Sequence, residues 1–88
     1  MNSYEVVIKN SAKKDLKKIK QSHLRKNFNT VIQSLKEDPF APTQSFEKLQ
    51  PRSDGFYSRR INQQHRIVYK VDEDARRVEI YSAWTHYE

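Results

Sequence analysis

Residues 56–84 read FYSRRINQQHRIVYKVDEDARRVEIYSAW, and this stretch decides the fold. It contains three runs with the alternating pattern and residue types of β-strands, at 56–61, 66–71 and 77–84. Turn-rich connectors of hairpin length separate the runs, so they predict an antiparallel meander. Apolar residues recur on one face of this meander, and they are Ile67, Tyr69, Val71, Val78 and Ile80.

The N-terminal part of the chain predicts one further strand and two helices. Residues 4–8 alternate as a strand, and Asn10 or Ser11 can cap the helix that follows. The first helix has a basic outer face and a narrow apolar stripe, formed by Ala12, Leu16 and Ile19. The second helix has a stronger stripe, formed by Leu24, Phe28, Val31, Ile32 and Leu35. It ends at Asp38, because a residue that precedes proline avoids the helical conformation.

Residues 38–55 contain all three prolines and the only glycine, so a long loop is expected there. The sequence thus predicts an α+β fold in a single domain that spans 1–88. Two N-terminal helices pack on one face of a small, twisted, mainly antiparallel four-stranded sheet, in the order β-α-α-β-β-β. The other face carries Arg66 and Lys70 and stays open for a ligand. Four aromatic residues are expected in the core rather than on a base-stacking platform: Phe28, Phe56, Tyr69 and Trp84.

Composition restricts the function classes. The chain has 88 residues and no cysteine, which excludes disulfides and cysteine-based zinc sites. No apolar run is long enough for a membrane span, and the first residues do not resemble a signal peptide, so we expect a cytoplasmic protein. The net charge is +6, with most of the excess in residues 1–40. A basic surface suits a polyanion such as nucleic acid, although lysines also simply keep a small protein soluble.

Several common catalytic motifs are missing. One glycine excludes a phosphate-binding loop and a dinucleotide loop. The histidines at 23, 65 and 86 lack metal-ligand spacing with carboxylates, and no serine has the context of a nucleophile elbow. Acid–base chemistry by histidine, glutamate and arginine remains.

RNA cleavage without a metal needs such a set. A base removes the 2′-hydroxyl proton, a cation stabilises the phosphoryl oxygens, and an acid protonates the leaving 5′-oxygen. The chain offers Glu47 in the long loop, His86 near its end, and Arg59, Arg60 and Arg66 on the strands. Each also has a simpler interpretation, since such a glutamate or histidine is usually just solvated and Arg66 can pair with a neighbouring acid.

A family resemblance sharpens this hypothesis. The stretches FEKL (46–49), GFYSRRI (55–61) and HRIVY (65–69), with the closing pair His86 and Tyr87, resemble the YoeB (Txe) branch of the RelE/ParE toxin superfamily. The resemblance spans nearly the whole chain. It implies a RelE-like fold, an mRNA interferase that acts at the ribosomal A site without a cofactor, and a YefM/Axe-type antitoxin. A homodimer is left open.

The resemblance also implies roles for single residues. Glu47 is similar to the general base, Arg66 to the transition-state stabiliser and His86 to the general acid. The substrate-binding residues that it implies are Arg60, Tyr87 and Arg59. The chain departs from the pattern at Glu88, which follows the closing tyrosine, and at Tyr57, where tryptophan is common.

Two other functions are also compatible with the sequence. One is a non-catalytic ParE-like toxin that binds a protein target such as gyrase, and the other is an RNA-binding module without chemistry.

Overall fold

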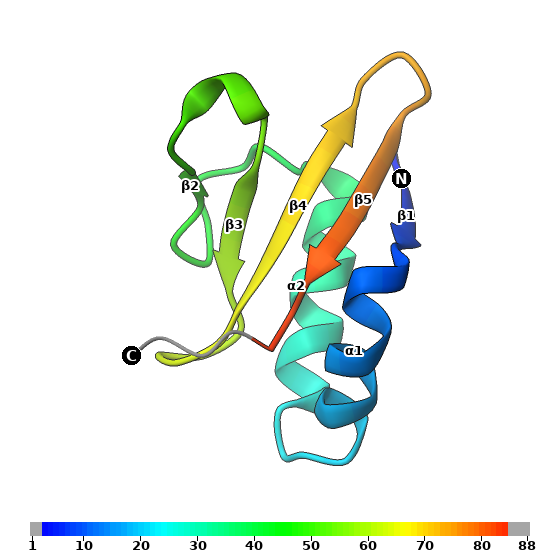
Figure 1. Cartoon of the computed structure of the whole chain (residues 1–88), viewed down its shortest axis with the longest axis vertical. Helices are drawn as coiled ribbons and strands as arrows, with labels where there is room; N and C mark the ends of the chain where they lie inside the picture. Colours follow the sequence, from blue (N-terminus) through cyan, green and yellow to red (C-terminus); the bar gives the residue numbers. More distant parts are fainter. Residues whose placement is uncertain (1–2, 85–88) are drawn as a thin grey trace.

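The computed structural model describes residues 3–84, which form a five-stranded mixed sheet and two α-helices (Figure 1). The helices are α1 (Lys13–Lys20) and α2 (Arg25–Glu37). The strands are β1 (Glu5–Ile8), β2 (Glu47–Lys48), β3 (Tyr57–Arg60), β4 (Arg66–Asp72) and β5 (Arg77–Ser82). Two short 3-10 helices, η1 (Asn10–Ala12) and η2 (Arg52–Asp54), precede α1 and β3.

The predicted α+β fold and its meander are confirmed. The strand order across the sheet is β1-β5-β4-β3-β2, and β3, β4 and β5 pair antiparallel in sequence order. β1 pairs with β5 in parallel. The helical connection brings the chain back to the end of the sheet where β1 began, so the first and last strands of the meander run in the same direction as β1. The prediction of four strands is wrong by one, since β2 forms within the expected loop and pairs antiparallel with β3.

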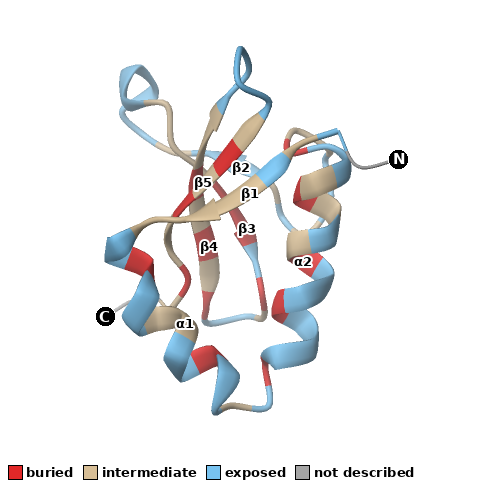
Figure 2. Ribbon diagram, turned by 90° about the vertical axis from the view of Figure 1, so that its right-hand side faces the viewer, coloured by how far each residue is buried: buried red, intermediate tan, exposed pale blue. Residues whose placement is uncertain are grey.

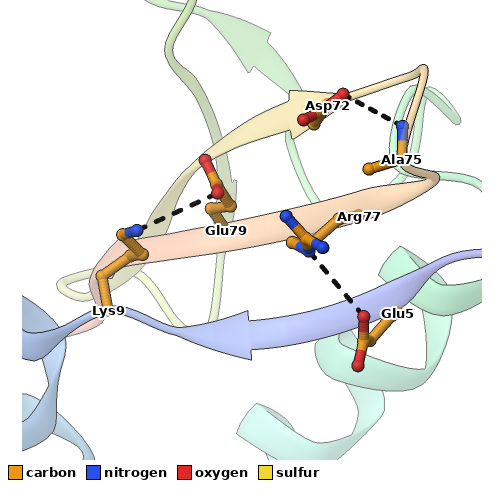
Figure 3. A network of polar contacts seen from close by, with 6 residues as sticks. All are labelled: Glu5, Lys9, Asp72, Ala75, Arg77 and Glu79. Carbon is orange, nitrogen blue, oxygen red and sulfur yellow. Dashed lines mark hydrogen bonds and ion pairs between the residues drawn. The ribbon is translucent and has the colours of Figure 1, made fainter.

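Two ion pairs join β1 and the residue that follows it to β5, beside the backbone ladder (Figure 3). The Arg77 Nε atom lies 3.8 Å from the Glu5 carboxylate, and the Lys9 Nζ atom lies 3.9 Å from the Glu79 carboxylate. Both pairs involve partly exposed side chains, so each contributes on the order of 1 kcal/mol or less. They help to set the parallel register, in which Glu5 faces Arg77.

The core lies between the sheet and the helices. In Figure 1, α2 passes behind the sheet and α1 lies beyond the end of β1. Figure 2 shows buried positions on both helices alternating with exposed ones, as amphipathic helices require. The buried apolar residues come from both helices and the meander: Ala12, Ile19, Leu24, Phe28, Val31, Leu35, Ile61, Ile67, Tyr69, Val78, Ile80 and Ala83. No helix within residues 3–84 has the length and apolarity that crossing a membrane would need.

Two local expectations are wrong. Neither Asn10 nor Ser11 caps α1, because η1 comes first and the Ser11 hydroxyl instead donates to the main-chain oxygen of Tyr81 at 2.7 Å. Phe56 is not a core residue, since its ring is only half-buried and lies edge-to-face against Tyr81. The core positions expected for Phe28 and Tyr69 are confirmed, and Trp84 packs against the core.

Candidate active site

The open face of the sheet brings together Glu47 and Arg66. Their closest side-chain atoms, Arg66 Nη1 and Glu47 Oε1, are 3.7 Å apart. The Arg66 side chain is only 15% exposed, whereas that of Glu47 is 61% exposed. A well-anchored cation therefore sits beside an accessible carboxylate, from residues 19 positions apart in the chain.

The sheet register explains this pairing. Glu47 of β2 faces Ser58 of β3, and Arg66 of β4 faces Arg60, which also belongs to β3. Side chains alternate along a strand, so Ser58 and Arg60 point to one face, together with their partners. Glu47 and Arg66 thus meet diagonally across β3, at the end of the sheet where the β3–β4 turn begins.

Arg60 lies on this same face and is exposed. Its Nη1 atom donates a hydrogen bond of 2.8 Å to the main-chain oxygen of Gln63 in the turn. Its guanidinium keeps further donors for a ligand, since an arginine has five. The structure therefore brings Arg60 alongside Arg66, and the two make this end of the face cationic.

Arg59 is not brought to this site. It points to the helix side of the sheet and is 0% exposed. Its guanidinium donates to the Ser34 hydroxyl at 2.7 Å and to the main-chain oxygens of Asp38 and Ala41 at 2.6 and 3.1 Å. The side chain that the resemblance associated with substrate thus binds the chain's own loop.

These contacts hold the segment that carries Glu47. Arg59 also lies over the ring of Phe46, 5.7 Å from its centroid, and Phe46 stacks on Tyr57 with ring centroids 5.6 Å apart. The next residue, Glu47, points to the opposite face because side chains alternate along a strand. Arg59 and Phe46 on the inside therefore fix the carboxylate on the outside.

His86 and Tyr87, the other two site residues that the sequence indicates, lie outside the described residues. The described chain ends with Trp84, whose ring stacks on His65 at a centroid distance of 4.0 Å. His65 is buried and immediately precedes Arg66. The stack therefore holds Trp84, two residues before His86, against His65, which is the neighbour of Arg66 in the chain. No sequence pattern indicated this packing role for His65.

Within residues 3–84, no three side chains of His, Asp or Glu gather as a metal site would need. Among the residues placed at this site, the groups able to act on a ligand are the Glu47 carboxylate and the two guanidinium groups.

The solved structures that this chain resembles include YoeB toxins, one of them in complex with its antitoxin. A YoeB/ParE toxin from Agrobacterium tumefaciens superposes with a TM-score of 0.82 at 29% identity, over 94% of this chain and 99% of that one. A YoeB dimer from Staphylococcus aureus gives 0.81 at 31% identity, over 97% and 99%. The toxin of a YoeB–YefM complex from the same organism gives 0.79 at 31% identity, over 96% and 98%. The class is thus that of small RelE/YoeB-fold toxins.

The family follows from the sequence comparisons. The family model described as the YoeB-like toxin of bacterial type II toxin–antitoxin systems matches residues 8–87, and the chain belongs to this family. Toxin YoeB of Synechocystis sp. is 37% identical over 65 residues, which are 74% of this chain and 73% of that toxin. Toxin YoeB of Escherichia coli K12 is 38% identical over 50 residues, which are 57% of this chain and 60% of that toxin.

Proposed function

We propose that this protein is a ribosome-associated mRNA endoribonuclease that inhibits translation and needs no metal. The observation that carries the proposal is the 3.7 Å approach of Glu47 and Arg66 on a sheet face that no helix of the described chain covers. Membership of the YoeB-like toxin family supports it. Its place of action would be the cytoplasm, where ribosomes translate.

The chemistry is an internal transfer within RNA. Glu47, as the accessible carboxylate, takes the proton of the 2′-hydroxyl, and the freed oxygen forms a bond to the adjacent phosphorus. The phosphorus–5′-oxygen bond breaks, which leaves a 2′,3′-cyclic phosphate and a 5′-hydroxyl end. Arg66 lies where its guanidinium can stabilise the charge on the phosphoryl oxygens.

His86 completes the proposed set as the acid that protonates the leaving 5′-oxygen. An imidazole can carry and release this proton near neutral pH. Arg60 and Tyr87 are proposed to position the substrate, Arg60 through the phosphate backbone and Tyr87 through stacking or hydrogen bonding. The buried Arg59 supports the loop and is not included among the substrate-binding residues.

The proposed partner that silences the toxin is a YefM-type antitoxin. A YoeB of Staphylococcus aureus with 31% identity to this chain forms a YoeB–YefM complex, which supports this choice. A second copy of the chain is a further proposed partner, because a YoeB dimer is known from the same organism.

The test is cleavage of mRNA on programmed ribosomes with EDTA present. The proposal expects cleavage by the wild type and a strong loss in Glu47→Gln, with ribosome binding retained. If the wild type inhibits growth but cuts no RNA, on or off the ribosome, the protein-binding toxin becomes the better account.

A further inference from the structure

A second group of side chains lies on the open face, away from the Glu47–Arg66 pair. Phe56 and Tyr81 meet edge-to-face, with ring centroids 5.2 Å apart at 89°. The Lys70 Nζ atom lies 4.6 Å from the Phe56 centroid and 5.7 Å from that of Tyr81. We call these three residues the Phe56–Tyr81–Lys70 cluster.

The two rings of this cluster do not serve the core. Both are half-buried, and neither is among the residues of the described chain that form the core or pack against it. Their neighbours Tyr57 and Ile80 point to the helix side and do contribute there. Two large aromatic rings are thus held where a ligand can reach them, at positions that a solvent-facing strand usually gives to polar residues.

Strand alternation places Tyr81 on the same face as Glu79, the register partner of Lys70. The β4–β5 register also shifts between Val68 and Tyr69, so Tyr81 is the extra residue between the pairs formed by Ile80 and Ser82. Such bulges often lie beside functional sites. The hydrogen bond from the Ser11 hydroxyl to the Tyr81 main-chain oxygen holds this irregular backbone in place.

The cluster has a positive charge. Within residues 3–84 no carboxylate lies within ion-pair distance of Lys70, although Glu79 faces it in the strand register. Glu79 instead pairs with Lys9 (Figure 3). The Lys9 Nζ atom is 6.0 Å from the Tyr81 centroid. Charges of the Lys9–Glu79 pair offset each other, which leaves Lys70 as the net charge beside the rings.

The cluster is continuous with the candidate active site. Lys70 and Arg66 lie on the same face of β4, four residues apart, which is about 13 Å along a strand. Phe56 precedes β3, whose Ser58 faces Glu47. A single extended strand of nucleic acid with its scissile phosphate at Arg66 would pass over the cluster.

We propose that the Phe56–Tyr81–Lys70 cluster is a second nucleotide subsite for single-stranded RNA. A base stacks on the Tyr81 ring, which the perpendicular Phe56 ring packs against, and Lys70 turns from the rings to a backbone phosphate. Aromatic platforms bordered by cations bind single strands with little sequence preference. The inference rests on the proposed function for the direction of the RNA, whereas binding itself can be measured without cleavage.

The test uses an eight-nucleotide, fluorescently labelled RNA with 2′-O-methyl groups, which lacks the nucleophile and cannot be cut. Tyr81→Ala should weaken its binding by about 5- to 150-fold, the range measured for loss of one stacked base. Tyr81→Phe keeps the ring and should bind close to the wild type. Lys70→Gln should lower the salt dependence by about 0.7 in log–log slope, and Lys36→Gln on α2 is the matched control.

Circular dichroism and urea midpoints establish which variants are folded, and Lys70→Gln tests the subsite even if Tyr81→Ala is unstable. The inference is overturned if folded variants bind this RNA like the wild type, or if the wild type does not bind it. It is also overturned if the variants lose affinity only for the antitoxin, which would make the cluster a protein-docking surface. If RNA binding depends on the cluster while ribosomal mRNA stays uncut, the subsite stands and the nuclease proposal fails.

Discussion

The Arg59 guanidinium donates a hydrogen bond of 2.6 Å to the main-chain oxygen of Asp38, 21 residues earlier in the chain. Together with its bonds to Ser34 and Ala41, this contact ties the end of α2 and the following loop to β3. The two terminal nitrogens of this fully buried cation are thereby bonded to neutral acceptors, whereas its Nε atom has no hydrogen-bond partner within the described residues. The loop that it holds leads directly to Glu47.

Arg59→Lys should therefore lower stability, although the charge is kept. Lysine cannot reproduce the planar fork, so at least one buried carbonyl loses its donor, at a cost of about 1–3 kcal/mol each. Urea unfolding should show a lower midpoint with an unchanged slope. Arg60→Lys, at the adjacent exposed position, should stay within about 0.5 kcal/mol of the wild type. Equal midpoints for the two variants would contradict the supporting role of Arg59.

Tyr69 gives a pH-dependent prediction. Burial raises the pKa of this phenol well above its ordinary value, and its hydroxyl donates to the Pro39 main-chain oxygen at 2.6 Å. The folded state favours the neutral phenol, so its contribution is fully present below the unfolded pKa of about 10 and is lost as pH rises beyond it.

Tyr69→Phe should cost about 1–3 kcal/mol at neutral pH, because the Pro39 carbonyl loses its donor. It should also flatten the fall in stability above pH 10. Both effects can be read from urea titrations at several pH values. A variant whose stability falls as steeply as the wild type over that range would show that other groups cause the loss.

Much of this fold follows from residue periodicity. Alternation in 66–71 and 77–84 predicts β4 and β5, and the apolar stripes predict both helices. β2 could not be predicted, because two residues cannot show a period and their pairing depends on the Phe46–Tyr57 stack. For Arg59 a signal was present in the sequence, since strand alternation places it on the same side as Tyr57 and Ile61, which both lie at the core.

The sequence alone predicted only part of the candidate site. Glu47 and Arg66 are distant in the chain, and strand pairing alone brings them together. Residue chemistry therefore made both of them candidates, and only the family resemblance assigned their roles. The aromatic pair of Phe56 and Tyr81 was assigned no binding role, because hydrophobicity suggests burial of Phe56 and because only the folded sheet brings the two rings together.

The lysines of α1 should contribute to ribosome association. Lys13, Lys14, Lys17 and Lys18 are all exposed, on a helix whose apolar stripe faces the core. Lysines contact phosphates without reading sequence, so changing all four to glutamate should weaken ribosome binding and reduce its dependence on salt. Sedimentation with ribosomes at two salt concentrations checks this. Unchanged association at both would mean that this face is only solvated.

The antitoxin should act by covering the active site. A cationic open face favours an acidic segment that folds on binding, which we expect over Glu47 and His86. Hydrogen exchange of the complex should then show new protection in 47–49 and 58–66. The β4–β5 turn at 73–76, far along the sheet, provides an internal reference. A complex that protects other regions only, and still cuts RNA, would contradict the prediction.

The acid–base assignment is the central claim, and single-turnover cleavage on programmed ribosomes tests it most directly. Glu47→Gln and His86→Gln keep much of the side-chain shape, and each should slow cleavage by roughly 10²–10⁴-fold with EDTA having no effect. Arg66→Ala should cost a comparable factor, and combining it with Glu47→Gln should cost less than the product of the two. If folded Glu47→Gln and His86→Gln both cut at the wild-type rate, these residues are not the base and the acid, and the account is contradicted.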